Sequence, residues 1–266
     1  MLKTLQYKPI GGVCQLCLQY RPLRESHVIP HSYFRHLMRR ASGKAIVLDD
    51  FPLTNVRSDS QQWVEPLLCG DCEVIIGRYE AYTIELLRSS ARGSEGRSGI
   101  SLAVEKPSAF RLFFSSVLWR ASVATKNEFQ KVLLPHELRE EARRALLTGS
   151  PLPYRQLTCK LRVLVDRSGG FNHDELRQLL TTPIPRVVKN PYSFLFVFDG
   201  LLVEFFCPGL GGSDSRSLGI VNGLNKIYVP AMDIFDVPEL VKLMVIGYGK
   251  NLDGKVTPAV KKMLRK

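Results

Sequence analysis

The sequence predicts a protein of the α+β class, and three observations support this prediction. Two Cys-x-x-Cys pairs bracket a polar, loop-rich stretch in the first third of the 266 residues. Apolar side chains in the middle of the chain recur at the spacing of helices, whereas the last third contains short apolar runs separated by turn residues, as strands do. We therefore expect three parts, namely a cysteine-bearing domain at residues 1–90, a connector at 91–105 and a mixed α+β domain at 106–266.

Helices are predicted at three places. Residues 73–87 directly follow the second cysteine pair and carry apolar side chains on one side of a helix. The Gly- and Ser-rich stretch 89–99 then predicts the connector. Pro107 suits the first turn of a helix, and the apolar run after it predicts a well-packed one. A further helix at 136–147 ends at Gly149, because glycine readily adopts the left-handed conformation that closes a helix.

Strands are predicted at residues 160–165, 194–198 and 201–206. Asp199 and Gly200 separate the last two, and this pair is a strong signal for a two-residue hairpin, since the tight turn needs positive φ angles. Both hairpin strands are apolar on both faces. We therefore expect a buried antiparallel hairpin that helices cover, rather than a sheet open to water.

The composition favours a cytoplasmic protein with a polyanionic partner. No run of about 18 apolar residues is present, and the opening residues lack the apolar segment of a secretory signal, so we expect no membrane association. The formal net charge is +12. Because each neutralised phosphate releases condensed counterions, an excess of Lys and Arg favours nucleic acid, and DNA in particular, as the partner. The oligomeric state is left open by the sequence.

Four of the six cysteines have the spacing of zinc ligands. They form two pairs with a two-residue gap, Cys14 and Cys17, then Cys69 and Cys72. Two such knuckles complete the tetrahedral shell of a structural zinc ion. A redox dithiol is the alternative, but it would explain only one pair and lacks its usual βαβ surroundings. Cys159 and Cys207 lie in apolar runs and are expected to be small buried side chains.

Two short motifs lie within and beside these knuckles. Residues 26–30 read Ser-His-Val-Ile-Pro, and residues 68–73 read Leu-Cys-Gly-Asp-Cys-Glu. In this order and spacing, the chain resembles the zinc-stabilised HNH endonuclease family over about residues 11–85. The resemblance implies a ββα-metal, treble-clef-like first domain that hydrolyses phosphodiester bonds of nucleic acid. It also implies a setting in bacterial restriction or antiphage defence, where such modules act beside partner subunits.

The resemblance also assigns roles to individual residues. His27 matches the general base, which takes a proton from the attacking water, and the ordinary pKa of histidine suits this work. Glu73 stands where the family has a histidine ligand of the catalytic divalent ion, Mg or Mn. Ser26 stands where the family usually has a second, anionic or imidazole ligand. Asn55 is matched to the middle asparagine of the family name, which orients a loop.

An additional ligand for that ion is expected among the neighbouring acidic and histidine residues, with a loop residue favoured. The candidates are Glu25, His31, Asp59, Glu65, Asp71 and Glu80.

Other interpretations of the same residues stay open. His27 could be a core histidine, and Glu73 could cap its helix, where the dipole favours a carboxylate. The altered residues Ser26 and Glu73 are also compatible with a non-catalytic zinc module that binds nucleic acid or protein. In a third interpretation, the domain at 106–266 senses a small ligand, although it contains no phosphate-binding glycine-rich loop.

Overall fold

The computed structural model describes residues 10–34, 45–49, 55–59, 63–91, 98–186 and 192–252. These residues form a mixed α+β structure with three sheets, which confirms the predicted class. One sheet has six strands and the other two have three strands each.

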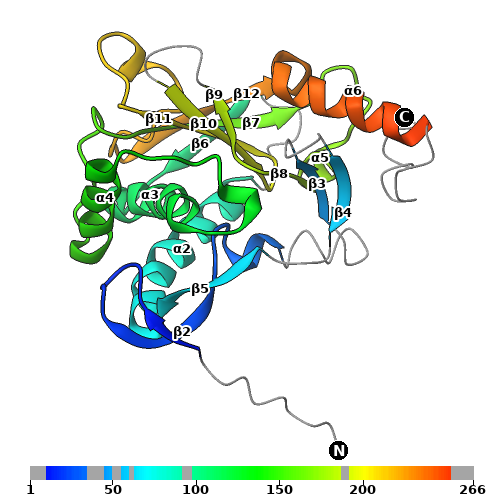
Figure 1. Cartoon of the computed structure of the whole chain (residues 1–266). Helices are drawn as coiled ribbons and strands as arrows, with labels where there is room; N and C mark the ends of the chain where they lie inside the picture. Colours follow the sequence, from blue (N-terminus) through cyan, green and yellow to red (C-terminus); the bar gives the residue numbers. More distant parts are fainter. Residues whose placement is uncertain are drawn as a thin grey trace, which may run out of the picture.

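The cysteine-bearing region forms a small antiparallel sheet that leads directly into a helix. Its strands, in the order β1-β2-β5, are β1 (Gly11–Val13), β2 (Tyr20–His27) and β5 (Val64–Cys69). Strand β5 runs without a loop into α2 (Gly70–Ala91). The register pairs Leu23 with Cys69 and His27 with Val64, with an irregularity between Arg24 and Glu25. The end of β2 therefore lies beside the strand that precedes α2 (Figure 1).

Three helices pack together behind this sheet. They are α2, α3 (Pro107–Val123) and α4 (His136–Thr148). Helix α3 is in contact with both α2 and α4, and almost all of its residues from Phe110 to Ala121 are buried. Each predicted helix is present, with Pro107 in the first turn of α3 and Gly149 at φ 72° closing α4. Helix α2 extends the predicted 73–87 segment in both directions.

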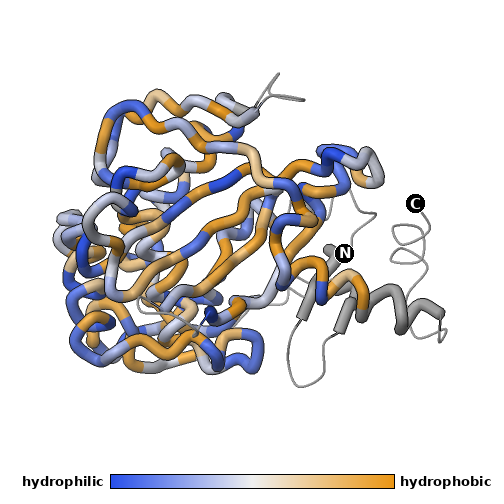
Figure 2. Tube along the Cα trace, turned by 90° about the horizontal axis from the view of Figure 1, so that it is seen from above, coloured by the Kyte–Doolittle hydropathy of each residue, from blue (hydrophilic) through white to orange (hydrophobic). Residues whose placement is uncertain are grey.

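The six-stranded sheet contains the predicted hairpin among its interior strands. Its order is β6 (Gly99–Ala103), β12 (Lys226–Asp233), β7 (Thr158–Val165), β11 (Leu201–Cys207), β10 (Tyr192–Phe198) and β9 (Ile184–Arg186). The turn residues Asp199 and Gly200 have φ angles of 49° and 75°, as the two-residue turn requires. Hydrophobic residues line the central strands (Figure 2).

The two faces of this sheet belong to two apolar clusters. Val203 and Phe205 pack into the larger cluster, which also contains Phe113 of α3. Leu202 faces the other way, into a cluster with Leu240 of α6 (Pro238–Leu252). Figure 1 shows α2, α3 and α4 on one side of the sheet and α6 beyond it. The hairpin is therefore covered on both faces, as its sequence predicts.

The remaining elements connect these layers. A third sheet, in the order β4-β3-β8, contains β3 (Ala45–Asp49), β4 (Asn55–Asp59) and β8 (Leu179–Thr181). The short helices are α5 (His173–Leu176), η1 (Asn127–Phe129), η2 (Asp214–Arg216) and η3 (Ile234–Asp236). Within the described ranges, every helix is too short or too polar to cross a bilayer.

The predicted connector at 91–105 contains a strand. Strand β6 lies within it and pairs with β12 in the large sheet. Its Ile100 and Leu102 are buried. The glycine and serine residues before this strand indicated a loop. The apolar residues of β6 alternate along the strand, so one face of it packs into the core. The larger apolar cluster also joins residues of both predicted domains, such as Ile76 and Phe196.

An ion pair fastens α6 to the edge of the large sheet. The Arg186 guanidinium on β9 donates to both carboxylate oxygens of Glu239, at 2.6 and 2.7 Å, and to Glu204 at 2.9 Å. These hydrogen bonds from Arg186 outweigh the effect of burial and lower the pKa of Glu239.

This pair predicts a pH dependence of stability. Because the pKa of Glu239 is lower in the folded state, its contribution is fully present above the unfolded pKa of about 4.3 and is lost as the pH falls through the folded pKa. Glu239→Gln should lower the free energy of unfolding at pH 7 by about 1 kcal/mol and flatten the decline towards pH 3. Urea denaturation at both pH values measures this. An equally steep decline in the variant would contradict the assignment.

Candidate functional site

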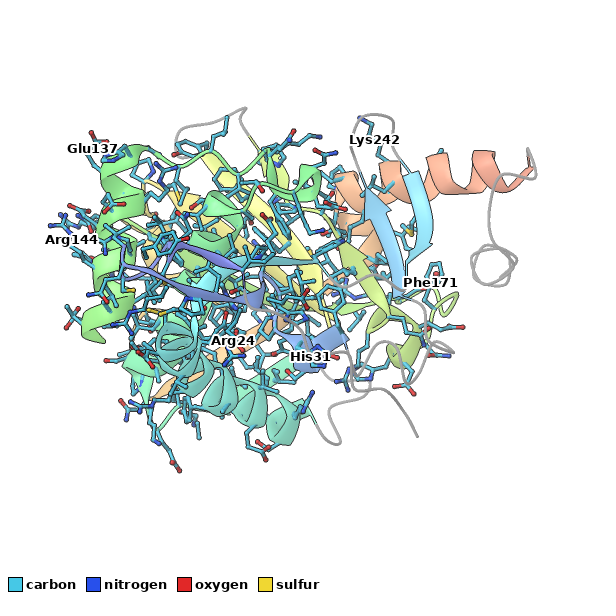
Figure 3. All side chains as sticks on the ribbon, turned by 60° about the horizontal axis from the view of Figure 1, so that its bottom comes forward. Arg24, His31, Glu137, Arg144, Phe171 and Lys242 are labelled. Atoms are coloured by element: carbon cyan, nitrogen blue, oxygen red, sulfur yellow. The ribbon has the colours of Figure 1, made fainter. Side chains whose placement is uncertain are left out.

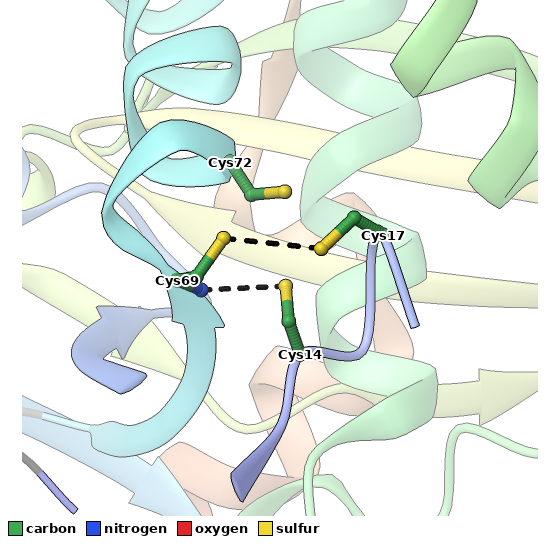
Figure 4. A group of neighbouring side chains, drawn as sticks. All are labelled: Cys14, Cys17, Cys69 and Cys72. Carbon is green, nitrogen blue, oxygen red and sulfur yellow. Dashed lines mark hydrogen bonds between the residues drawn. The ribbon is translucent and has the colours of Figure 1, made fainter. Parts of the chain in front are cut away.

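The four predicted zinc ligands lie together although they come from distant parts of the chain. Cys14 and Cys17 lie in the turn between β1 and β2, Cys69 ends β5, and Cys72 is in the first turn of α2. Their Sγ atoms all lie within 4.8 Å of one another, and those of Cys17 and Cys69 are 3.9 Å apart (Figure 4). The two knuckles therefore converge on one point.

The geometry of this cluster fits a tetrahedral metal ion. Sulfur ligands at about 2.3 Å from a zinc ion lie roughly 3.8 Å from one another. All four cysteines are free thiols rather than disulfides. The amide N–H of Cys69 also donates to the Sγ of Cys14 at 3.3 Å, the kind of bond that stabilises a thiolate. The cluster could therefore bind a metal ion such as zinc.

The cysteines differ in how easily they ionise. At Cys14, burial favours the thiol, but backbone N–H groups outweigh this effect and lower its pKa. At Cys72, burial and the neighbouring thiols raise the pKa. A metal ion would offset the repulsion among four thiolates, so its binding must release protons.

Contacts from elsewhere hold the first knuckle. The amide of Gln15 donates to Leu67 O at 3.0 Å, across to β5. Arg143 of α4 donates to Leu16 O at 2.8 Å. Leu18 has a positive φ of 61°, which lets the chain turn back into β2. The knuckle is thus supported by a strand on one side and a helix on the other.

His27 lies at the end of β2 and is half-buried. Its Nε2 is 3.2 Å from Nδ1 of His31, and the two rings meet edge to face with centroids 4.8 Å apart. The ring of Phe34 lies 6.3 Å away, between centroids. His31 is exposed on the helical turn at residues 31–34 and is labelled in Figure 3. The His27 imidazole is therefore held between a polar and an apolar neighbour.

Ser26 and Glu73 are bonded to each other. The Ser26 hydroxyl is fully buried, donates to the Glu73 carboxylate and accepts from the amide of Leu68 at 3.1 Å. Burial raises the pKa of Glu73, against the opposing effects of the Ser26 hydrogen bond and the Arg120 charge. The structure thus brings together the two residues to which the HNH resemblance assigns ligand positions.

Three of the acidic residues proposed as extra ligands, Glu65, Asp71 and Glu80, have protein partners. Both Glu65 oxygens accept bonds from Thr125 and Lys126 at 2.7 to 3.0 Å. Asp71 pairs with Arg21, and Glu80 pairs with Arg120, each at 2.6 Å. Across the described ranges, the four cysteines are the only group of three or more Cys, His, Asp and Glu residues placed to share an ion. Binding of Mg or Mn therefore stays a prediction.

Asn55 lies in a different sheet from His27. It begins β4 and pairs with Asp49 of β3, whereas His27 belongs to the β1-β2-β5 sheet. Asp59, at the other end of β4, lies in the same separate sheet. The proposed role of Asn55 therefore stays a prediction that depends on the resemblance.

Sequence reasoning missed Arg120. This residue of α3 is 1% exposed, and its guanidinium donates to the backbone oxygen of His27. The signal was present in the sequence, because Arg120 is a charged residue at the end of a long apolar run. Its partners could not be identified from that signal.

An open groove lies beside the cysteine cluster. It has a volume of about 240 Å³, and the residues that line it are Arg21, Pro22, Arg24, Cys69, Gly70 and Asp71. Arg24, labelled in Figure 3, is exposed. The groove is therefore net basic, a property that favours contact with phosphate.

Comparisons with protein-family models, curated proteins and solved structures found no match. Function is therefore inferred from the residues and geometry of the site.

Zinc content provides a direct test of the cysteine cluster. Protein purified without chelator should contain about one zinc per chain, and Cys17→Ser or Cys72→Ser should lose it. Because metal binding contributes to folding, Tm should fall by about 10 °C or more in these variants. Cys159→Ala is the matched control, since Cys159 is buried in β7 outside the cluster. Elemental analysis that finds well under one zinc in the wild type would refute the assignment.

Proposed function

We propose that the chain is an HNH-like endonuclease that hydrolyses phosphodiester bonds of nucleic acid, with DNA as the favoured substrate. The observation that carries this proposal is the position of His27. It ends β2 beside a helix whose first turn contains Cys72 and Glu73. This order, a strand with the candidate base followed by a strand and a helix with a carboxylate, is what the resemblance implies.

Zinc would have a structural role in this proposal. Cysteine sulfur would fill all four coordination positions of the ion, which would leave none for water or substrate. Its effect would be to tie the turn between β1 and β2 to the first turn of α2. Because Glu73 lies in that first turn of α2 and His27 ends the strand that follows the β1–β2 turn, the ion would support the site without taking part in the reaction.

His27 is the proposed general base. An imidazole takes a proton efficiently near neutral pH, and such a base typically contributes 10²–10⁴-fold to the rate. The half-exposed ring can be reached by water, and its contact with His31 limits its rotation. A water molecule that loses its proton to His27 could then attack phosphorus, which breaks the bond to one bridging oxygen of the phosphodiester, and that oxygen leaves with a proton from solvent.

Glu73 is the proposed ligand of a divalent ion. Magnesium is often held by one or two carboxylates, with substrate phosphate and water completing its shell. Such an ion would stabilise the negative charge that develops on the phosphate. The half-buried Glu73 carboxylate and the Ser26 hydroxyl offer two adjacent oxygen atoms for this purpose.

The charge of the chain supports nucleic acid as substrate. The formal charge is +12, and Arg21 and Arg24 line the groove beside the cysteine cluster. Contacts of this kind bind the phosphate backbone and carry no sequence information. The defence setting and the partner subunit that the resemblance implies stay part of the proposal.

A second candidate is a non-catalytic zinc module that binds nucleic acid or protein. The observation that favours it is the hydrogen bond between Ser26 and Glu73. Each group satisfies the other, and a buried pair of this kind is stable without any ion. The two candidates share the zinc site and differ in whether His27 and Glu73 react.

Cleavage assays distinguish these candidates. Purified protein is incubated with plasmid, single-stranded DNA and RNA, with Mg, Mn or EDTA. His27→Ala should lower the rate by about 100-fold or more. His136→Ala is the control, because His136 is exposed at the start of α4. If wild type and His27→Ala leave every substrate equally intact, catalysis is abandoned and the binding module is retained.

Substitution of Glu73 tests the ion. Glu73→Gln keeps the size of the side chain and an acceptor for Ser26 but removes the negative charge. We expect the variant to fold and retain zinc, yet to require about tenfold or more Mg or Mn for half-maximal cleavage, because one anionic ligand is lost. Rates measured across a metal titration test this. The same metal dependence in wild type and variant would remove Glu73 from the proposed ligand set.

A further inference from the structure

Arg120 forms an unusual set of contacts for a residue in a buried helix. Its guanidinium donates through Nη1 to the backbone oxygen of His27 and through Nη2 to Glu80 Oε1 at 2.6 Å. Its Nε also donates to Ser116 O at 3.3 Å, within α3. One side chain of α3 thus contacts the end of β2 and the middle of α2.

Stability alone does not require an arginine at this position. Burial of a charge is costly unless it is paired, and a buried ion pair can often be replaced by apolar residues without loss of stability. The surrounding residues of α3, such as Leu118 and Trp119, show that apolar side chains pack well here. An apolar residue would fill the same space, but it could not make the hydrogen bonds that Arg120 forms with residues outside α3.

Those contacts reach both the strand that carries His27 and the helix that carries Glu73. The bond to the His27 backbone lies one peptide unit from Ser26 and directly at the candidate base. The bond to Glu80 fixes α2 at a point two helical turns, about 10 Å, beyond Glu73. At this spacing the carboxylates of Glu73 and Glu80 lie near the same side of the helix.

We propose that Arg120 is a positioning residue, which holds His27 and the Glu73-bearing helix α2 in a fixed relation. This inference rests on the proposed function, since it assigns a role in the same site. Its two-armed contact requires the planar fork of a guanidinium, which an ammonium group cannot reproduce.

A consequence concerns the region at 106–266. Helix α3 belongs to that region, so the region completes the site rather than only binding a target or a partner. Two other contacts also join this region to the cysteine-bearing region. Arg143 of α4 supports the first knuckle, and Glu65 of β5 binds the backbone N–H groups just after α3.

The test compares two matched substitutions. Arg120→Lys keeps the buried charge but removes the simultaneous contact with His27 and Glu80. Arg186→Lys is the control, because Arg186 also binds carboxylates but lies on β9 against α6, where the second apolar cluster is located. Zinc content and Tm are measured for both, and the NMR signals of the His27 carbonyl carbon and ring nitrogens report the position of the base.

In Arg120→Lys we expect the His27 signals to shift and kcat to fall by about 10- to 100-fold, with KM within about twofold and zinc retained. In Arg186→Lys the His27 signals and kcat should match the wild type. In a His27→Ala background, Arg120→Lys should cause little further loss of rate. If Arg120→Lys fails to fold, Glu80→Gln, which loosens one arm only, replaces it with the same expected direction.

Unchanged His27 signals in Arg120→Lys would overturn the inference, as would equal shifts in Arg186→Lys, which would indicate a general structural effect. The absence of cleavage by the wild type has a different meaning. It would refute the nuclease, whereas the NMR comparison would still decide whether Arg120 positions His27.

Discussion

The convergence of four sulfur atoms sets where the first turn of α2 lies relative to the β1–β2 hairpin. Cys14 and Cys17 come from the hairpin, and Cys69 and Cys72 come from the junction of β5 with α2. Ser26 and His27 lie on β2 of this hairpin, and Glu73 lies in the first turn of α2. Three of the four cysteines are buried, and the pKa of Cys14 is lowered whereas that of Cys72 is raised. A bound metal ion would hold all four as thiolates and so stabilise the cluster.

The helices α3 and α4 impose the second constraint. They belong to the region after residue 105, yet Arg143 holds the first knuckle and Arg120 holds the end of β2. A single apolar cluster extends from the cysteines through α3 to the large sheet. The β1-β2-β5 sheet and α2 are therefore stabilised from the side that faces α3 and α4, while the groove lined by Arg21 and Arg24 stays open.

The bond between Ser26 and Glu73 is central to both candidate functions. In a nuclease, the Glu73 carboxylate would bind a divalent ion that arrives with the substrate, and its hydrogen bond from Ser26 would weaken. In a binding module, the same bond would be a permanent part of the core, and His27 would be one more packed side chain. Because both arrangements use the same zinc-stabilised scaffold, the fold is compatible with either. The reactivity of His27 and the metal dependence of Glu73 distinguish them.

The sequence by itself determined the features that depend on local geometry. Helical spacing and terminal residues predicted α2, α3 and α4. The preference of an Asp-Gly pair for positive φ angles predicted the turn at Asp199 and Gly200, and the two-residue gaps identified the cysteine pairs. Tertiary structure alone decided which distant groups meet. It paired Arg120 with His27 and Glu80, gave Glu65 a structural role, placed Asn55 in a separate sheet and added β6 to the large sheet. The physical reason is that periodicity and φ preferences act over a few residues, whereas these partners are set by how whole layers pack.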